Sequence, residues 1–328
     1  MGAVLDRNGL RPSRYYVTKD DRVIMASEVG VLPIDNENIA KKGRLEPGKI
    51  FLIDFQQGKL LSDKEVKEPL IEARPYRNWL HDNRLVVRKI KRSDSDTALG
   101  TNELTKRMRA FGYTTETLEF MMLPMVHDLR DPLGSMGNDS ALAVLSHKHR
   151  LLYDYFKQLF AQVSNPAIDS IREKIIMSLE CYIGPEKNIL EPTEAHAHRL
   201  LIENPLLTNT ALYAIKHLDH EGHKSQVIDI TFDVSESSSD SLKSAVIRVC
   251  EEAEDAVDNG IGFLVLSDRN VNKNRAAISS LMACGAIHHH LVKTAKRTKT
   301  AIVVESAEAR EVHHLCLLFG YGADAINP

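Results

Sequence analysis

The chain has 328 residues, of which 43% are hydrophobic, enough for one large domain or two smaller ones. A net charge of −3 gives no electrostatic basis for binding nucleic acid or an anionic membrane surface. No uncharged run is long enough to span a bilayer, and residues 1–10 lack the basic-then-apolar pattern of a secretion signal. We therefore expect a cytoplasmic protein with neither nucleic acid nor membrane as a partner.

Residues 1–69 are predicted to be rich in β-strands. Strands are expected at 14–18 and 23–26 around a polar turn, and at 50–55 and 59–61 around Gln56-Gln57-Gly58. These strands are short and close in sequence, so the segment has too few elements for a stable core of its own. Residues 70–100 are charged and irregular, which predicts a solvated connector.

Residues 101–220 are predicted to be mainly helical, with helices at 101–111, 115–122, 150–162, 170–182 and 193–201. Pro124 is expected to stop the second of these. The third rests on the helical spacing of six apolar side chains: Leu152, Tyr155, Phe156, Leu159, Phe160 and Val163. The glycine-rich run before it, 134–139 (GSMGND), lacks the Lys-Ser/Thr pair of a phosphate loop. By its residues alone, this whole region is scaffold.

Residues 224–328 alternate between apolar strands and helices. Strands are expected at 227–234, 261–266, 300–305 and 323–327, and helices at 241–259, 275–297 and 307–320. This succession predicts an α/β fold with a parallel sheet, as half of a (β/α)₈ barrel or as a doubly wound sheet.

Polar residues follow the predicted strands at their carboxyl ends, where such folds place their chemistry. They are Asp233, Ser267, Asp268, Arg269, Glu305, Ser306 and Asn327. Two interpretations stay open. The residues form a functional rim, or they cap the following helices and pair with one another.

The histidines and cysteines predict no metal site. His196 and His198 are two residues apart on a predicted helix and point to different sides. The run 288–290 (HHH) has the same difficulty, because successive helical residues point about 100° apart. The four cysteines have neither metal-binding nor redox spacing and are predicted to be free, buried thiols: Cys181, Cys250, Cys284 and Cys316.

As a string of residues the chain resembles the glutamate synthase large subunit over nearly its whole length. The central domain of that family is resembled by 134–139 (GSMGND), 153–169 (YDYFKQLFAQVSNPAID), 285–292 (GAIHHHLV) and 308–315 (EAREVHHL). The closing part of a class II glutamine amidotransferase domain is resembled by 6–12 (DRNGLRP), 26–28 (ASE) and 42–48 (KGRLEPG). Residues 126–132 (VHDLRDP) depart from the family pattern.

The resemblance implies a division into an amidotransferase remnant (1–69), a connector (70–100) and a central domain (101–328). It implies a parent enzyme that makes two glutamates from glutamine, 2-oxoglutarate and reducing equivalents. In the family, the central domain joins the catalytic domains and helps to wall the path of ammonia between them. Residues at a domain interface or on that path are, by this resemblance, Ser135, Asn138, Asp139, Asp268, Arg269 and Glu305.

The resemblance also implies that this segment is inactive alone. The amidotransferase family uses an N-terminal cysteine, whereas this chain begins with Met1-Gly2, so we expect neither catalytic residues nor glutaminase activity. FMN and a 3Fe-4S cluster are implied for the parent's flavin barrel, with no cofactor bound by this segment. The implied partners are the glutaminase and FMN domains, in the same chain or in separate chains, and an electron-donating subunit or ferredoxin.

Two other functions stay open on the sequence. One is a stand-alone, non-catalytic binding or regulatory module derived from that central domain. The other is binding of a small phosphorylated ligand by the β/α half, which an FMN titration tests and for which we expect no signal.

Overall fold

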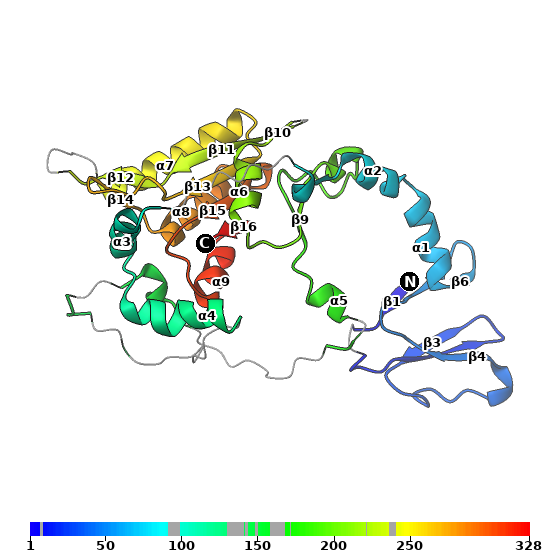
Figure 1. Cartoon of the computed structure of the whole chain (residues 1–328). Helices are drawn as coiled ribbons and strands as arrows, with labels where there is room; N and C mark the ends of the chain where they lie inside the picture. The colour runs from blue at the N-terminus through cyan, green and yellow to red at the C-terminus, as the bar shows by residue number, and fades with distance from the viewer. Residues whose placement is uncertain are drawn as a thin grey trace. The chain divides into compact units, whose positions relative to one another are not determined.

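The structure is a computed structural model of the chain (Figure 1). It describes residues 1–6, 9–90, 99–129, 141, 144–147, 150–157, 168–170, 172–220, 222–235 and 241–328. The chain divides into two compact units. Residues 1–79 and 164–171 form unit 1, and residues 80–163 and 172–328 form unit 2.

Unit 1 contains two three-stranded antiparallel sheets, with the strand orders β1-β5-β6 and β3-β2-β4. Their strands are β1 (Gly2–Val4), β2 (Arg14–Thr18), β3 (Val23–Ala26), β4 (Ile39–Arg44), β5 (Ile50–Asp54) and β6 (Lys59–Leu61). The predicted strands 14–18 and 23–26 are confirmed, and so is the hairpin that ends at Leu61. Strand β4 was not predicted, because its polar run Lys41-Lys42-Gly43 becomes a strand only by pairing with β2.

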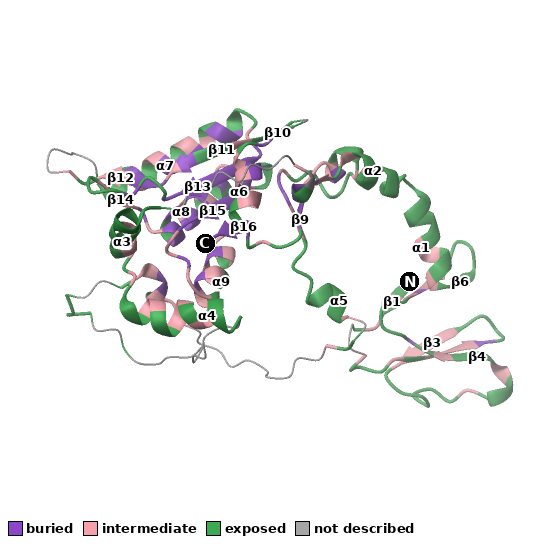
Figure 2. Ribbon diagram, viewed as in Figure 1, coloured by how far each residue is buried: buried purple, intermediate pink, exposed green. Residues whose placement is uncertain are grey.

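Unit 1 has very little core, as its short strands predict. Among residues 1–6 and 9–79, only Thr18, Leu45 and Phe51 are buried. Its strands are mostly pink and green in Figure 2, unlike the largely purple sheet of unit 2. Phe55 and Ile71 are 74% and 66% exposed. Since apolar burial is the main source of folding free energy, this unit gains little stability by itself.

Two helices occupy residues that were predicted to be partly irregular. They are α1 (Asp63–Glu72) and α2 (Tyr76–Asn83), followed by β7 (Leu85–Val86) and the 3₁₀ helix η2 (Val87–Lys89). Helix α1 begins at a capping box in which Ser62 and Glu65 each accept the other's backbone N–H. The prediction of irregular structure over 70–89 was wrong because it weighed the charge of the stretch and overlooked this capping signal.

The main sheet of unit 2 has the strand order β10-β11-β13-β15-β16. Strands β11, β13, β15 and β16 are parallel to one another, and β10 is antiparallel to β11. Its strands are β10 (Asp219–His220), β11 (His223–Asp229), β13 (Phe263–Ser267), β15 (Ala301–Glu305) and β16 (Ala325–Asn327). The helices between the parallel strands are α7 (Leu242–Asp258), α8 (Ser280–Lys293) and α9 (Val312–Gly320). The predicted α/β class and the strand–helix succession are therefore confirmed.

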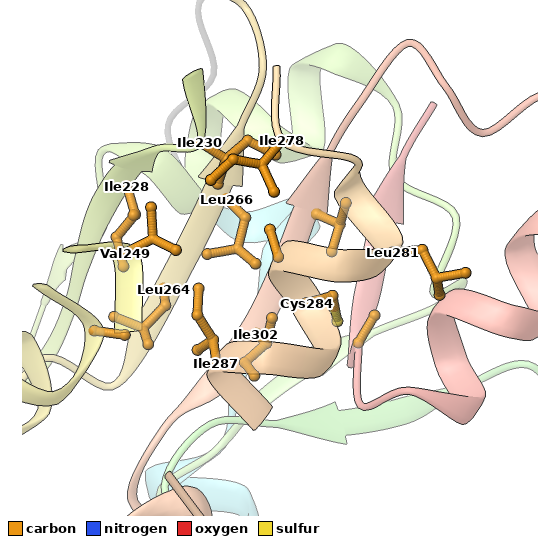
Figure 3. Packing of buried hydrophobic residues seen from close by; sticks show 14 of the residues in the cluster. Ile228, Ile230, Val249, Leu264, Leu266, Ile278, Leu281, Cys284, Ile287 and Ile302 are labelled. Carbon is orange, nitrogen blue, oxygen red and sulfur yellow. The ribbon is translucent and has the colours of Figure 1, made fainter. Parts of the chain in front are cut away.

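Both faces of this sheet are buried. Successive residues of a strand point to opposite faces, and here both sets are apolar. Leu264 and Leu266 of β13 pack in a core with α7, α8 and α9 (Figure 3). Phe263 precedes Leu264, and Val265 lies between the two leucines. Both pack in a second core with helix α6 (Asn209–Lys216) and the small sheet around β9. The result is a layered fold with the parallel sheet in the middle.

The barrel-like part of the fold prediction is not confirmed. In the part of the chain that the structure describes, β10 and β16 are the two edges of the sheet, which does not close on itself. The parallel strands follow one another in chain order, as in one half of a (β/α)₈ barrel. The face that would line a barrel interior is instead covered by α6 and β9.

The helix predicted over 150–162 was wrong for its described part, residues 150–157. This part contains a single 3₁₀ turn, η4 (Leu152–Tyr155), and then extended backbone at Phe156. The helical pattern did not include Tyr153, yet this side chain is fully buried, whereas Tyr155 is 57% exposed. Tyr153 donates or accepts a hydrogen bond with Ser280 Oγ (2.7 Å) and stacks on His314. These tertiary contacts override the local helical periodicity.

The helices predicted over 170–182 and 193–201 are also replaced, by short turns and a small sheet. Among the described residues of these two segments, only α5 (Glu173–Ile176) and the 3₁₀ helix η5 (Glu194–Ala197) are helical. The ends of both segments are strands, β8 (Cys181–Ile183) and β9 (Leu200–Ile202), in a sheet of order β7-β9-β8. All three residues of β9 are buried against the main sheet, so burial decides their conformation.

Two further helices have different bounds from those predicted. The second predicted helix does not stop before Pro124 but runs from a π-helical segment, η3 (Thr117–Met122), into α4 (Leu123–His127). Pro124 lies in the first turn of α4, where its missing N–H is not needed. The segment predicted as helix from Arg275 begins as strand β14 (Arg275–Ala277), which pairs with β12 (Thr231–Asp233). The helix α8 starts only at Ser280.

The remaining elements are η1 (Asn36–Asn38), α3 (Thr101–Ala110) and η6 (Arg297–Lys299). Within the described ranges, the chain forms no helix with the length and apolar character needed to cross a bilayer.

A buried histidine makes the stability of unit 2 dependent on pH. His223 is 2% exposed and stacks on His198 with 4.0 Å between ring centroids. Burial, and then the charges of His198 and His220, lower its pKa from 6.5 to about 4. Between pH 6.5 and pH 4 the unfolded chain therefore binds a proton at this histidine that the folded chain does not bind. The free energy of unfolding thus falls as the pH drops from 6.5 toward 4.

The free energy of unfolding of the wild type should fall between pH 7.5 and pH 5. In the His223→Phe variant this fall should be smaller by up to about 2 kcal/mol. The measurement is urea unfolding followed by circular dichroism at both pH values. The control is His127→Phe, at a side chain that is 81% exposed. Equal pH dependence in the wild type and in His223→Phe would show that this histidine does not couple protonation to folding.

Candidate functional site

The carboxyl ends of three parallel strands bring the predicted residues Asp268, Arg269 and Glu305 together. Strand β13 ends at Ser267, β15 at Glu305 and β16 at Asn327, and the register places Ser267 opposite Glu305 and Glu305 opposite Asn327. Because the strands are parallel, their carboxyl ends lie at one edge, and the residues that follow them meet there. Asp233 is not part of this group, because it lies in β12 and accepts the backbone N–H of Ser235.

Glu305 is the centre of a buried ion-pair network. Its carboxylate accepts hydrogen bonds from Lys216 Nζ (2.5 Å), Ser267 Oγ (2.5 Å) and Arg269 Nε. The Glu305 side chain is 4% exposed and that of Lys216 is 19% exposed. Burial by itself raises the pKa of Glu305, but the bonds from Lys216 and Ser267 and the charge of Lys216 outweigh it, so the pKa lies below its usual value. The residue is a buried carboxylate that two cations hold in its charged form.

Asp268 has a different environment, because its carboxylate has no cation beside it among the described residues. Ser306 Oγ (2.6 Å) and the Ala307 backbone N–H (3.1 Å) both donate to its Oδ2 atom. Burial, together with the negative charges of Glu308 and Glu305, raises the pKa of Asp268 to about 6, although the hydrogen bonds from Ser306 and Ala307 oppose this rise. The residue itself is 4% exposed.

A cavity of about 340 Å³ lies above these residues. Its polar floor includes Asp268, Arg269 and Glu305. Its other wall is apolar and comes from α3, the turn after it and the π-helical segment η3, through Leu104, Met108, Phe111, Leu118 and Met122. The volume falls in the range of small-molecule sites.

Two side chains fasten this apolar wall to the core of unit 2. Arg310 donates hydrogen bonds to the backbone carbonyls of Phe111 and Gly112, and its guanidinium lies 3.8 Å from the centroid of the Tyr113 ring. The Tyr113 hydroxyl donates to the carbonyl of Ala307 (2.8 Å). The turn that holds the wall in place is therefore bonded to the loop after β15.

The other three predicted interface residues, Ser135, Asn138 and Asp139, lie outside the described residues. The network also contains residues that the sequence did not indicate. Lys216 lies on α6, which covers the face of the sheet opposite to α7, α8 and α9. Tyr113 and Arg310 are 197 positions apart in the chain. No local pattern relates these positions, so that only the fold brings them together.

Several of the histidines take part in hydrogen bonds or ion pairs. His196 Nδ1 accepts the Thr193 backbone N–H in a helix cap (3.0 Å), and His290 Nε2 contacts Glu254 (2.5 Å). His288 Nδ1 accepts from Arg297 Nε (3.0 Å). Among the described residues, no group of three or more His, Cys, Asp or Glu side chains is arranged to hold a metal ion.

The thiols are poorly suited to nucleophilic or cluster chemistry. Burial raises the pKa of Cys284 to about 12 and also raises the pKa of Cys181 and Cys250. Nucleophilic attack and iron–sulfur ligation both require a thiolate. Cys316 is exposed. The carboxylates and cations at the strand ends can bind and orient a polar group.

Comparison with known proteins adds the family context. The family model described as the glutamate synthase central domain matches residues 106–328, and the one described as class-II glutamine amidotransferases matches residues 1–79. All of this chain aligns with the large chain of an NADPH glutamate synthase from Bacillus subtilis, at 46% identity over 328 residues. It also aligns with an NADH glutamate synthase from Schizosaccharomyces pombe at 47% identity, and with a ferredoxin-dependent glutamate synthase from Arabidopsis thaliana at 42%.

These relatives are much longer than the chain. It covers 21%, 16% and 20% of their respective lengths, and each of them aligns with 100% of it.

Replacing Glu305 tests the network at the strand ends. We expect Glu305→Gln to lower the free energy of unfolding by about 3 kcal/mol, because it leaves a mostly buried Lys216 cation without its carboxylate. The control is Glu203→Gln, which removes a surface ion pair with Arg88 whose side chains are 60% and 64% exposed, and it should cost less than about 1 kcal/mol. Urea unfolding measures both, and equal costs would show that the buried network adds no stability.

Proposed function

Because this chain belongs to the glutamate synthase central-domain family, we propose that it acts as a section of a glutamate synthase. That enzyme would convert glutamine, 2-oxoglutarate and reducing equivalents into two glutamates. The observation that carries the proposal is the uninterrupted match of the whole chain to glutamate synthase large chains, at 46% identity in the Bacillus subtilis protein. The match to the amidotransferase model over residues 1–79 places a glutaminase section beside the central domain in the same chain.

We propose that the role of this section is connection and guidance, without a reaction step of its own. Unit 2 offers a rigid sheet buried on both faces, which suits a part that holds catalytic domains at a fixed separation. Asp268, Arg269 and Glu305, at its carboxyl edge, would face the neighbouring domain or the ammonia path. Thiols with raised pKa values support the absence of a glutaminase nucleophile in this section.

The proposed partners and cofactors follow from the relatives. A glutaminase domain and an FMN-carrying synthase domain would complete the enzyme, from the same chain or from separate chains. FMN and a 3Fe-4S cluster would be held outside this section, because its described cysteines do not fit a cluster. The relatives are named for NADPH, NADH and ferredoxin, so the match is compatible with any of these electron donors.

Purification tests the proposal directly. The purified chain should release no ammonia from glutamine, and in its natural host it should co-purify with polypeptide that carries an N-terminal-cysteine glutaminase and a flavin domain, either as further parts of its own chain or as separate chains. A coupled glutamate dehydrogenase assay and mass spectrometry measure the two outcomes. Ammonia release by the chain alone would contradict its inactivity. Recovery without such domains would favour a stand-alone binding module.

A leak of ammonia tests the guiding role. In the complete enzyme, Arg269→Ala should lower the amount of 2-oxoglutarate consumed per glutamine hydrolysed below one, because it opens the polar edge beside Glu305. The control is Arg88→Ala, at another exposed arginine that also pairs with a glutamate. An unchanged ratio in Arg269→Ala would remove this edge from the ammonia path.

A further inference from the structure

The cavity at the carboxyl edge of the main sheet combines an apolar wall with one carboxylate that lacks a cation. Leu104, Met108 and Leu118 are among its apolar lining residues, and Asp268 is part of its polar floor. A cavity of about 340 Å³ with these properties has room for a ring or a short branched chain.

Asp268 lines this cavity, and one oxygen of its carboxylate has no donor among the described residues. Both hydrogen bonds to the carboxylate go to Oδ2, and no described residue donates to Oδ1. The fully enclosed side-chain atoms without a partner in the described part of the chain are nitrogens of Arg199, His223 and Arg310. Oδ1 of Asp268 is not one of them, so it keeps access to the open space that Asp268 lines.

The cations that line the cavity are already paired with carboxylates. Arg107 bonds to Glu103 Oε1 (3.0 Å), and Arg269 bonds to Glu305. The charges that act most on Asp268 are instead negative, from Glu308 and Glu305. The electrostatic balance around its free oxygen therefore favours a positive ligand and disfavours an anion.

We propose that this cavity binds an organic cation, with an apolar body against α3 and η3 and one protonated amine that donates to Asp268 Oδ1. The ammonium group would supply the charge-assisted hydrogen bond that Asp268 lacks among the described residues. The apolar body would displace water from the wall formed by Met108 and its neighbours. This site goes beyond the proposed function, although it uses the same carboxyl edge of the sheet, and its binding can be measured on the chain itself.

Benzylammonium is a suitable probe, because it joins one aromatic ring to one primary ammonium group. We expect isothermal titration calorimetry on the full chain at pH 7.5 to show saturable binding of one benzylammonium per chain. Benzyl alcohol, benzoate and ammonium chloride serve as matched ligands that lack the charge, reverse it or lack the ring. Each should bind at least about tenfold more weakly. Equal binding of ammonium would remove the apolar body from the proposal, and equal binding of benzyl alcohol would remove the charge.

Two variants test the site from opposite walls. Asp268→Asn removes the charge and should weaken binding about 10- to 100-fold, the worth of a charge-assisted hydrogen bond. Met108→Trp fills the cavity from the side of α3 and should weaken binding while Asp268 stays in place. The control is Asp233→Asn, at a strand-end aspartate outside the cavity lining. Circular dichroism and unfolding midpoints establish that each variant is folded.

The pH dependence gives an independent check. Since the pKa of Asp268 is about 6, affinity should fall as the pH is lowered from 7.5 to 5, where the carboxylate takes up a proton that competes with the ligand. The charged or titratable groups around it that could mimic this effect are Glu305, Glu308, Arg269, Tyr113 and Tyr153. The pKa of Glu305 is lowered and those of Tyr113 and Tyr153 are raised, all away from that range, and Asp268→Asn should abolish the dependence.

Absence of saturable benzylammonium binding to the folded wild-type chain would overturn the inference. Binding that persists unchanged in both Asp268→Asn and Met108→Trp would place the cation elsewhere and would overturn it equally. Neither result bears on whether the chain is part of a glutamate synthase, because the co-purification experiment is read separately.

Discussion

Unit 2 depends on one constraint, that a parallel sheet must be covered on both of its faces. Strands β13, β15 and β16 are buried at odd and even positions alike, so either face left open would expose a continuous hydrophobic surface. Helices α7, α8 and α9 cover one face, and α6 with β9 covers the other. The second layer recruits segments far away in sequence, and it is the reason that residues 200–202 are strand and not helix.

The same constraint places the charged groups. With both faces closed, polar side chains can leave the sheet only at its ends, and parallel strands bring their carboxyl ends to one edge. Glu305 ends its strand inside the protein and stays charged because Lys216 reaches it from the layer on the opposite face. Asp268, one residue beyond the neighbouring strand, receives two neutral donors and two unfavourable charges. A stabilising ion pair and a carboxylate whose charged form is disfavoured by its surroundings thus lie side by side.

Unit 1 illustrates the opposite case. Its strands form sheets with few buried side chains, so their hydrogen bonds are not supported by a large core. This agrees with its match to class-II glutamine amidotransferases over residues 1–79 and with the greater length of the relatives. Unit 2, in contrast, has two large cores, whose buried residues, except Val87, all lie in the segment that matches the central domain.

The sequence determined the strand–helix succession of the main sheet in residues 224–328, because a strand buried on both faces is apolar throughout and is recognisable without its neighbours. It missed the small β12–β14 sheet, since the predicted strand 227–234 is divided between β11 and β12 and the predicted helix from Arg275 begins as β14. It also placed Asp268, Arg269 and Glu305 at one edge, and its sequence motifs identified the family. Only the tertiary structure decided residues 150–157 and 181–202, where the helical spacing of apolar residues was overridden by contacts such as those of Tyr153 with Ser280 and His314. Lys216, Tyr113 and Arg310 likewise joined the site through the fold alone, since periodicity reports which face of an element is apolar but not which distant element covers it.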